Sequence, residues 1–118
     1  MSAPNLDFPL QIVESEGRVT VRFPANTTLS EANAEAFAQA LLALAASEER
    51  PHLLVDLGGV TMLTSVILAK IIAVNGKVRA AGGRLTLFNP TPVVHQVFKV
   101  TRLDTILEVN PLAHPLPA

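Results

Sequence analysis

Hydrophobic and polar residues alternate near the start of the chain in a pattern that predicts two β-strands. Residues 8–23, FPLQIVESEGRVTVRF, contain a turn signal at Ser15-Glu16-Gly17. After this turn every second residue is apolar, which is the period of a strand with one buried face. The apolar positions are Val19, Val21 and Phe23, and they alternate with Arg18, Thr20 and Arg22.

A spacing of three and four between apolar residues predicts a helix in residues 29–49. These apolar positions form one stripe along the helix: Leu29, Ala32, Ala36, Phe37, Ala40, Leu41 and Leu44. We expect Thr28 or Ser30 to be the N-cap, because Thr28 and Glu31 have the spacing of a capping box.

The rest of the chain alternates between strands and helices. The continuous apolar run in HLLVDLG, residues 52–58, predicts a strand buried on both faces. A second helix is expected from Ser65 to Ala81, where Gly82 and Gly83 allow the left-handed conformation of a C-cap. Further on, we expect a strand at 84–89, a short helix at 91–101 capped by Thr91, and a last strand or extended segment at 105–109.

This order of elements predicts a single α/β domain with a mixed sheet of four to five strands packed with helices. The connection from residues 52–58 through the second helix to residues 84–89 should join two parallel strands by a right-handed crossover. The length of 118 residues suits one domain with a core at about residues 8–110. Residues 111–118 contain three prolines, and we expect an irregular tail there.

The amino-acid composition argues against several classes of function. The chain has a formal net charge of −1 and no clustered Lys and Arg, so we expect no nucleic-acid partner. It has no cysteine, and His52, His95 and His114 are too scattered for a metal-ligand motif. No glycine-rich nucleotide motif and no pair of acids at catalytic spacing is present. We therefore expect no cofactor, no metal and no enzymatic activity.

The termini and the apolar runs favour a cytoplasmic protein. The first ten residues lack the basic start and long apolar core of a signal peptide. The most apolar run, Met62–Val74, is interrupted by Lys70 and is too short to cross a bilayer. We expect no membrane insertion.

Asp56 is the acid closest to the carboxyl end of the predicted central strand, where α/β folds often place functional groups. We interpret it as an acceptor for the backbone N–H groups of the following turn. A small-molecule sensor or an enzyme that uses Asp56 is a third reading of the chain, and the apolar Met62-Leu63 turn argues against it.

Two hydroxyls, Thr64 and Ser65, stand at the start of the second predicted helix. Ser65 falls at its cap or first turn, where backbone N–H groups have no intrahelical partner. A neutral hydroxyl there caps the helix, and the residues alone favour this interpretation. The same N–H groups and the helix dipole would also favour a phosphate, which could change a partner's affinity without unfolding the domain.

The helix that follows carries more apolar residues than one stripe needs. We expect Leu68, Ile71, Ile72 and Val78 to face the sheet. Val66, Ile67 and Val74 then need another contact, either a neighbouring helix or a partner protein. An exposed Val66-Ile67 patch would also be compatible with a homodimer.

Residues 53–109, from LLVDLGG to TILEV, resemble the STAS domain of bacterial anti-sigma factor antagonists. The resemblance rests on the order of its parts: a strand ending in Asp, a hydrophobic-Ser turn, a long helix, an A-G-G-R-L strand, an N-P-x-P segment, a short helix and L-D. It extends over roughly residues 10–110, which is nearly the whole chain.

The resemblance implies regulation of sigma-factor-dependent transcription by partner switching. An anti-sigma factor with serine kinase activity would phosphorylate Ser65; the unphosphorylated chain would bind that factor, and phosphorylation would release it. The implied binding surface comprises residues 24–30 and the start of the second helix: Asn26, Thr27, Ser30, Thr64, Ser65, Val66, Ile67 and Lys70.

The chain departs from the family pattern beside Ser65. Thr64 stands where the family usually has Asp, and Ile67 stands where it usually has Gly. Three outcomes are open: Ser65 is phosphorylated by a divergent kinase, Thr64 is a second acceptor, or the surface binds a partner constitutively. In the last case the chain would be an adaptor or scaffold subunit, stressosome-like or lipid-transport-associated, without a phospho-switch.

Overall fold

The computed structural model describes residues 10–47 and 49–112, which fold around a five-stranded mixed sheet. The strand order is β1-β2-β4-β6-β7, and only the β1–β2 pair is antiparallel. The strands are β1 (Gln11–Ser15), β2 (Arg18–Arg22), β4 (His52–Asp56), β6 (Arg84–Phe88) and β7 (Glu108–Asn110). The predicted α/β class with a mixed sheet is confirmed, and so is the parallel pairing of β4 with β6.

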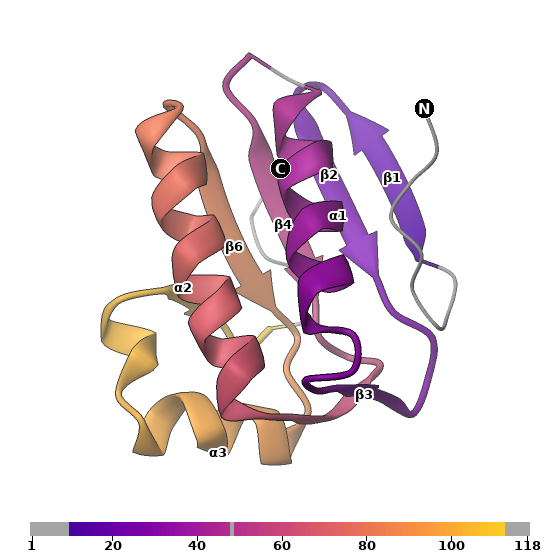
Figure 1. Ribbon diagram of the computed structural model, residues 1–118, viewed down its shortest axis with the longest axis vertical. Helices are drawn as coiled ribbons and strands as arrows, with labels where there is room; N and C mark the ends of the chain where they lie inside the picture. Colours follow the sequence, from indigo (N-terminus) through magenta and orange to yellow (C-terminus); the bar gives the residue numbers. More distant parts are fainter. Residues whose placement is uncertain (1–9, 48, 113–118) are drawn as a thin grey trace.

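Three α-helices and one 3₁₀ helix complete the domain: α1 (Ala34–Ala46), α2 (Ser65–Ala80), α3 (Pro92–Val100) and η1 (Leu103–Thr105). Figure 1 shows α1 and α2 side by side in front of the sheet, with α3 at the end where α2 begins. The main core lies between the sheet and these two helices. Its fully buried side chains include Val19, Leu53, Leu85, Phe37, Leu41 and Ile71.

The central strand β4 is buried on both of its faces, as its continuous apolar sequence predicted. Leu53 and Val55 belong to the core under the helices. Leu54 points to the opposite face of the sheet because successive side chains of a strand alternate. It is nevertheless buried, as are its neighbours on β6, Thr86 and Phe88.

The end of α2 has the glycine cap that the sequence predicted. The N–H of Gly83 donates to the carbonyl of Val78 at 2.9 Å, and the N–H of Gly82 donates to that of Arg79 at 3.0 Å. This pair of bonds is the Schellman arrangement, in which the residue after the cap is left-handed. Gly82 meets that requirement with a φ of 83°.

The start of α1 differs from the prediction. The helix begins at Ala34, after a turn at residues 31–33, and Asn33 rather than Thr28 or Ser30 is at its N-cap position. Asn33 accepts a hydrogen bond from the Ser30 N–H and donates one to the Thr28 carbonyl, both at 2.9 Å. Residues 28 and 29 cannot join the helix because they belong to a strand, β3 (Thr27–Leu29).

That strand forms a second, two-stranded parallel sheet with β5 (Val60–Leu63), which the sequence did not predict. The last strand also differs in detail: residues 103–105 form η1, and β7 covers only residues 108–110. The expected irregular tail and His114 lie largely outside the described residues, which end at Leu112.

A candidate partner-binding site at the start of α2

The small β3–β5 sheet brings together the two segments that the sequence assigned to one binding surface. Thr28 pairs with Met62, and Leu29 pairs with Leu63. The N–H of Thr64 donates to the carbonyl of Leu29 at 3.1 Å, so the pairing continues to the first residue before α2. Figure 1 shows β3 beside the chain that leads into α2.

Gly59 permits the close approach of these segments. A Cβ atom at this position would lie 2.4 Å from the carbonyl oxygen of Phe23 and 2.5 Å from that of Pro24. The Gly59 carbonyl in turn accepts a hydrogen bond from the Thr27 N–H at 2.9 Å. Thr27 is buried, and its hydroxyl donates to the Pro24 carbonyl at 2.6 Å. Thr27 therefore supports the loop and is not part of an accessible surface.

Ser65 is the first residue of α2, and it is exposed. The first hydrogen bond of the helix joins the N–H of Leu68 to the carbonyl of Thr64 at 3.2 Å. The N–H groups of Ser65, Val66 and Ile67 precede this bond and have no acceptor among the described residues. The Ser65 hydroxyl thus lies at the positive end of the helix dipole, beside unpaired donors.

Thr64 occupies the N-cap position, but its hydroxyl does not cap the helix. Its Oγ1 atom is buried and has no hydrogen-bond partner among the described residues. The cap interpretation of these two hydroxyls therefore fails for Thr64. Its hydroxyl is inaccessible, whereas the neighbouring Ser65 is exposed.

The apolar residues of the first turn of α2 divide between surface and core. Val66 is 37% exposed, and Met62, which precedes the helix, is 58% exposed. Ile67 is 0% exposed and packs in the core, so it cannot contribute accessible surface. Val74 is also buried, while Ile72, which we expected to face the sheet, is exposed.

Lys70 also comes from the predicted set, and it forms an ion pair with Glu35 of α1 at 2.8 Å. The hydrogen bond from Lys70 is the main reason why the pKa of Glu35 lies below its ordinary value, and a second bond from Gln39 adds to it. Lys70 thus links α1 to α2 through this ion pair.

We call the accessible set the β3–α2 face and define it as Asn26, Thr28, Ser30, Met62, Ser65 and Val66. The sequence did not name Thr28 or Met62 individually as a residue of the binding surface. Their place on this surface follows from the β3–β5 register in the structure, in which they are paired neighbours. None of these six side chains is charged.

Asp56 has the structural role expected from its turn. Its Oδ1 atom accepts hydrogen bonds from the Gly58 N–H at 2.8 Å and from the Asn89 side chain at 3.1 Å. Its Oδ2 atom lies 3.3 Å from Nε of Arg22. The carboxylate therefore ties together the carboxyl ends of β2, β4 and β6, and these contacts account for its place there.

The two histidines in the described part of the chain, His52 and His95, do not belong to a metal-binding group. His52 begins β4, and its Nε2 atom lies 3.0 Å from the hydroxyl of Thr86. Burial is the main cause that lowers the pKa of His52, and Arg84 and Arg18 lower it further. Within residues 10–47 and 49–112, no group of three His, Cys, Asp or Glu could hold a metal ion, and no helix is long and apolar enough to cross a membrane.

Three solved structures illustrate the similarity of the fold. An anti-sigma factor antagonist from Mycobacterium paratuberculosis is 24% identical, with 90% of this chain and 87% of that chain covered and a TM-score of 0.75. An anti-sigma-factor antagonist (STAS) domain protein from Planctomyces limnophilus is 21% identical, with coverage of 87% and 90% and a TM-score of 0.76. The Bacillus cell fate determinant SpoIIAA in its phosphorylated form is 15% identical, with coverage of 86% and 90% and a TM-score of 0.62.

At the sequence level, no curated protein matches the chain. A family model described as "Mlab, STAS domain" matches residues 13–108, which include every strand of the main sheet except the first residues of β1 and the last residues of β7. The chain therefore belongs to the STAS domain family.

Proposed function

We propose that this chain is a non-enzymatic anti-sigma factor antagonist that works by partner switching. In this role the unphosphorylated β3–α2 face binds an anti-sigma factor with serine kinase activity and so frees a sigma factor in the cytoplasm. Phosphorylation of Ser65 by that kinase dissociates the chain from the anti-sigma factor. The observation that carries the proposal is the exposed Ser65 hydroxyl at the first residue of α2, beside unpaired backbone N–H groups.

The surroundings of Ser65 suit a reversible negative charge. A phosphate there would meet the unpaired N–H groups and the positive end of the dipole of a 16-residue helix. It would add about −1.5 to −2 charges at pH 7. The β3–α2 face is uncharged and partly apolar, so a partner can cover it at little cost in desolvation free energy. A phosphate would raise that cost, because a charged group loses its hydration when it is buried.

Burial distinguishes between the two candidate acceptors. The Thr64 hydroxyl is inaccessible, and a phosphate on it would require the start of α2 to move. The Ser65 side chain is exposed and needs no such movement. We therefore propose Ser65 as the acceptor and exclude Thr64 from that role. The phosphorylated form in which the structurally similar SpoIIAA of Bacillus was solved supports a phospho-switch on this fold.

The test is a phosphorylation reaction followed by a binding measurement. The full chain is incubated with ATP and the kinase-type anti-sigma factor encoded nearest to its gene, and its intact mass is recorded. We expect one added phosphate on the wild type and on Thr64→Val, and none on Ser65→Ala. No mass increase on the wild type, or an increase that persists in Ser65→Ala, would remove Ser65 from this role.

A second candidate function is a constitutive STAS adaptor or scaffold subunit, stressosome-like or lipid-transport-associated. The altered first turn favours it, because Thr64 and Ile67 replace the Asp and Gly of the switching pattern. The description of the matching family model, which names Mlab and not anti-sigma factor antagonism, also supports it. Here the β3–α2 face would bind without any phosphorylated pool.

The two functions predict different phosphorylation states of the chain in cells. Intact-mass analysis of the chain purified from its own cells, with phosphatases inhibited, should show a fraction carrying one phosphate if the switch operates. A single unphosphorylated species under all growth conditions, with stable binding to one partner complex, would favour the adaptor.

A further inference from the structure

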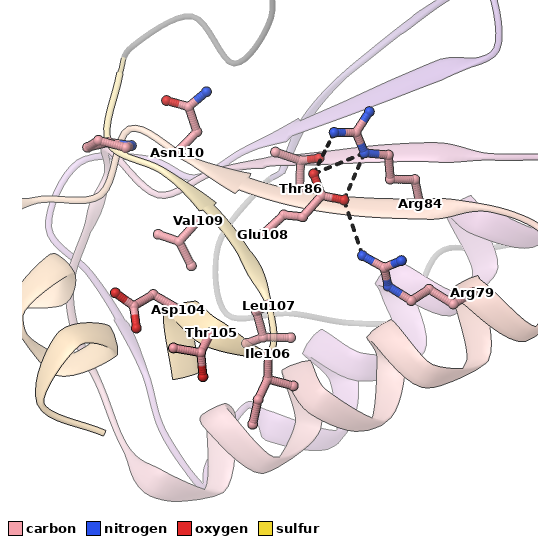
Figure 2. A pocket seen from close by; sticks show the side chains of 11 residues that line it. Arg79, Arg84, Thr86, Asp104, Thr105, Ile106, Leu107, Glu108, Val109 and Asn110 are labelled. Atoms are coloured by element: carbon pink, nitrogen blue, oxygen red, sulfur yellow. Dashed lines mark hydrogen bonds and ion pairs between the residues drawn. The ribbon is translucent and has the colours of Figure 1, made fainter. Parts of the chain in front are cut away.

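A groove on the far side of α2 from the β3–α2 face is lined by η1, β7, the start of β6 and the end of α2. This open groove has a volume of about 590 Å³, which is large enough for a small molecule. Figure 2 shows Arg79 and Arg84 at one end of the groove, converging on Glu108, and Asp104 and Thr105 toward the other. Ile106, Leu107 and Val109 supply its apolar part.

The cationic end is held by four short hydrogen bonds. Nε of Arg84 donates to Oε1 and Oε2 of Glu108 at 2.8 and 3.0 Å, and its Nη2 donates to Oε2 at 2.6 Å. Nη2 of Arg79 donates to Oε1 at 3.2 Å. The hydrogen bonds with Arg84 are the main reason why the pKa of Glu108 lies below its ordinary value, and they raise the pKa of Arg84.

Each guanidinium keeps N–H donors that these hydrogen bonds do not occupy. Nε of Arg79 donates to the side chain of Asn75 at 3.3 Å, and the second terminal nitrogen, Nη1, of each arginine has no acceptor in the described part of the chain. Both arginine side chains are about half exposed, at 49%. Two positive charges against the one negative charge of Glu108 leave a net charge of +1 at this end.

We propose that this groove is a binding site for a small anionic molecule whose phosphate or carboxylate group is held by Arg79 and Arg84. Glu108 is the positioning residue: it orients two guanidiniums from different elements, so the anion meets donors already in place. A planar guanidinium with a free edge suits both phosphate and carboxylate groups. The body of the ligand would lie along Thr105 and Ile106, which line the groove and are exposed.

A titration of the full chain followed by amide and arginine Nε NMR signals tests the proposal. The probes are inorganic phosphate and succinate, each at constant ionic strength with chloride as the balancing ion. We expect saturable shifts at the arginine signals and at the amides of residues 105–109, and the tighter probe identifies the headgroup. Equal shifts at Arg50 and Arg102, or shifts that do not saturate, would mean general charge screening and would overturn the proposal.

Substitutions distinguish an anion-binding site from an ion-pair cluster whose only role is to hold β7 in place. Arg79→Gln leaves the three Arg84 bonds intact, and it should weaken anion binding by about tenfold, the loss expected for one charge-assisted hydrogen bond. Arg102→Gln is the matched control and should change nothing. Glu108→Gln removes the carboxylate that orients both guanidiniums, and it should weaken anion binding even though it leaves the groove more positive. Unchanged binding in both Arg79→Gln and Glu108→Gln would overturn the site.

Discussion

The backbone N–H of Thr64 donates to the carbonyl of Leu29 at 3.1 Å, and this bond connects two segments that are 35 residues apart in the chain. It continues the β3–β5 pairing up to the start of α2. As a result the residue that precedes Ser65 is held in place by the loop before α1. The accessible residues of both segments therefore form one surface. Four predictions test the physical basis of the structure, each by comparing two substitutions.

Replacing Ser65 by Asp should not destabilise the domain. A negative charge in the first turn of a helix contributes about 0.3–1 kcal/mol at low ionic strength, because it meets the positive end of the dipole. Ser65→Asn has nearly the same shape without the charge and is the matched control. Urea unfolding should show Ser65→Asp to be the more stable of the two, with the difference falling as salt is added. A less stable Asp variant would contradict the arrangement at the start of α2.

Thr64→Val should leave the stability unchanged or raise it, by about 1 kcal/mol at most, because the buried hydroxyl that it removes has no partner. The control is Thr86→Val. The Thr86 hydroxyl is also buried, but it is hydrogen-bonded to His52 at 3.0 Å, so its loss should destabilise the domain by about 1–3 kcal/mol. Both free energies of unfolding come from urea titrations. A large loss in Thr64→Val would show that its hydroxyl has a partner in solution.

Gly59→Ala and Gly76→Ala should change stability in opposite directions. A Cβ atom at residue 59 would collide with two backbone carbonyls, and separating them should cost about 1–3 kcal/mol or more. A Cβ atom at residue 76 meets nothing within 4 Å, and alanine in a helix is favoured over glycine by about 1 kcal/mol. Thermal unfolding of the two variants provides the measurement. If Gly59→Ala were neutral, Gly59 would not lie as close to the carbonyls of Phe23 and Pro24 as described.

Glu108 should make the domain less stable in acid. Its pKa is lower in the folded chain than in the unfolded chain, mainly because of the hydrogen bonds from Arg84. Its contribution is therefore complete above the unfolded pKa of about 4.3 and is lost as the pH falls through the lower folded value.

At pH 7, Glu108→Gln should be less stable than the wild type by about 1 kcal/mol, the upper end for a partly exposed ion pair, and the two should converge in acid. Urea unfolding across this pH range is the measurement. Glu31→Gln serves as the control because Glu31 is exposed and forms no ion pair with any described residue. A stability difference for Glu108→Gln that stays constant down to pH 2 would contradict the ion-pair origin.

The regular elements could be predicted because each one repeats a short-range pattern. The alternation in β2, the apolar run of β4 and the Gly82-Gly83 cap are all local signals, and each was found where it was expected. The β3–β5 sheet could not be predicted in this way. Its strands have three and four residues, and what stabilises them is pairing with each other across 30 residues of chain.

The orientation of α2 shows a second limit. The apolar residues of α2 lie on more than one side of the helix, so their spacing alone does not decide which of them face the sheet. The buried stripe contains Ile67, Ile71, Val74 and Val78. The sequence had placed Ile72 on the sheet side and had left Ile67 and Val74 for a neighbouring helix or a partner. For the candidate site, Ser65 was placed correctly at the start of the helix, and the burial of Ile67 was missed for this reason.

The burial of Ile67 also bears on how an enzyme could modify Ser65. With this side chain in the core and Thr64 tied to β3, the two residues on either side of Ser65-Val66 are both anchored. Drawing this segment out as an extended strand into a catalytic cleft would break the hydrogen bond between Thr64 and Leu29 and remove Ile67 from the core. An enzyme that modified Ser65 would therefore have to recognise the folded domain, and a short synthetic peptide with the same residues would lack that geometry.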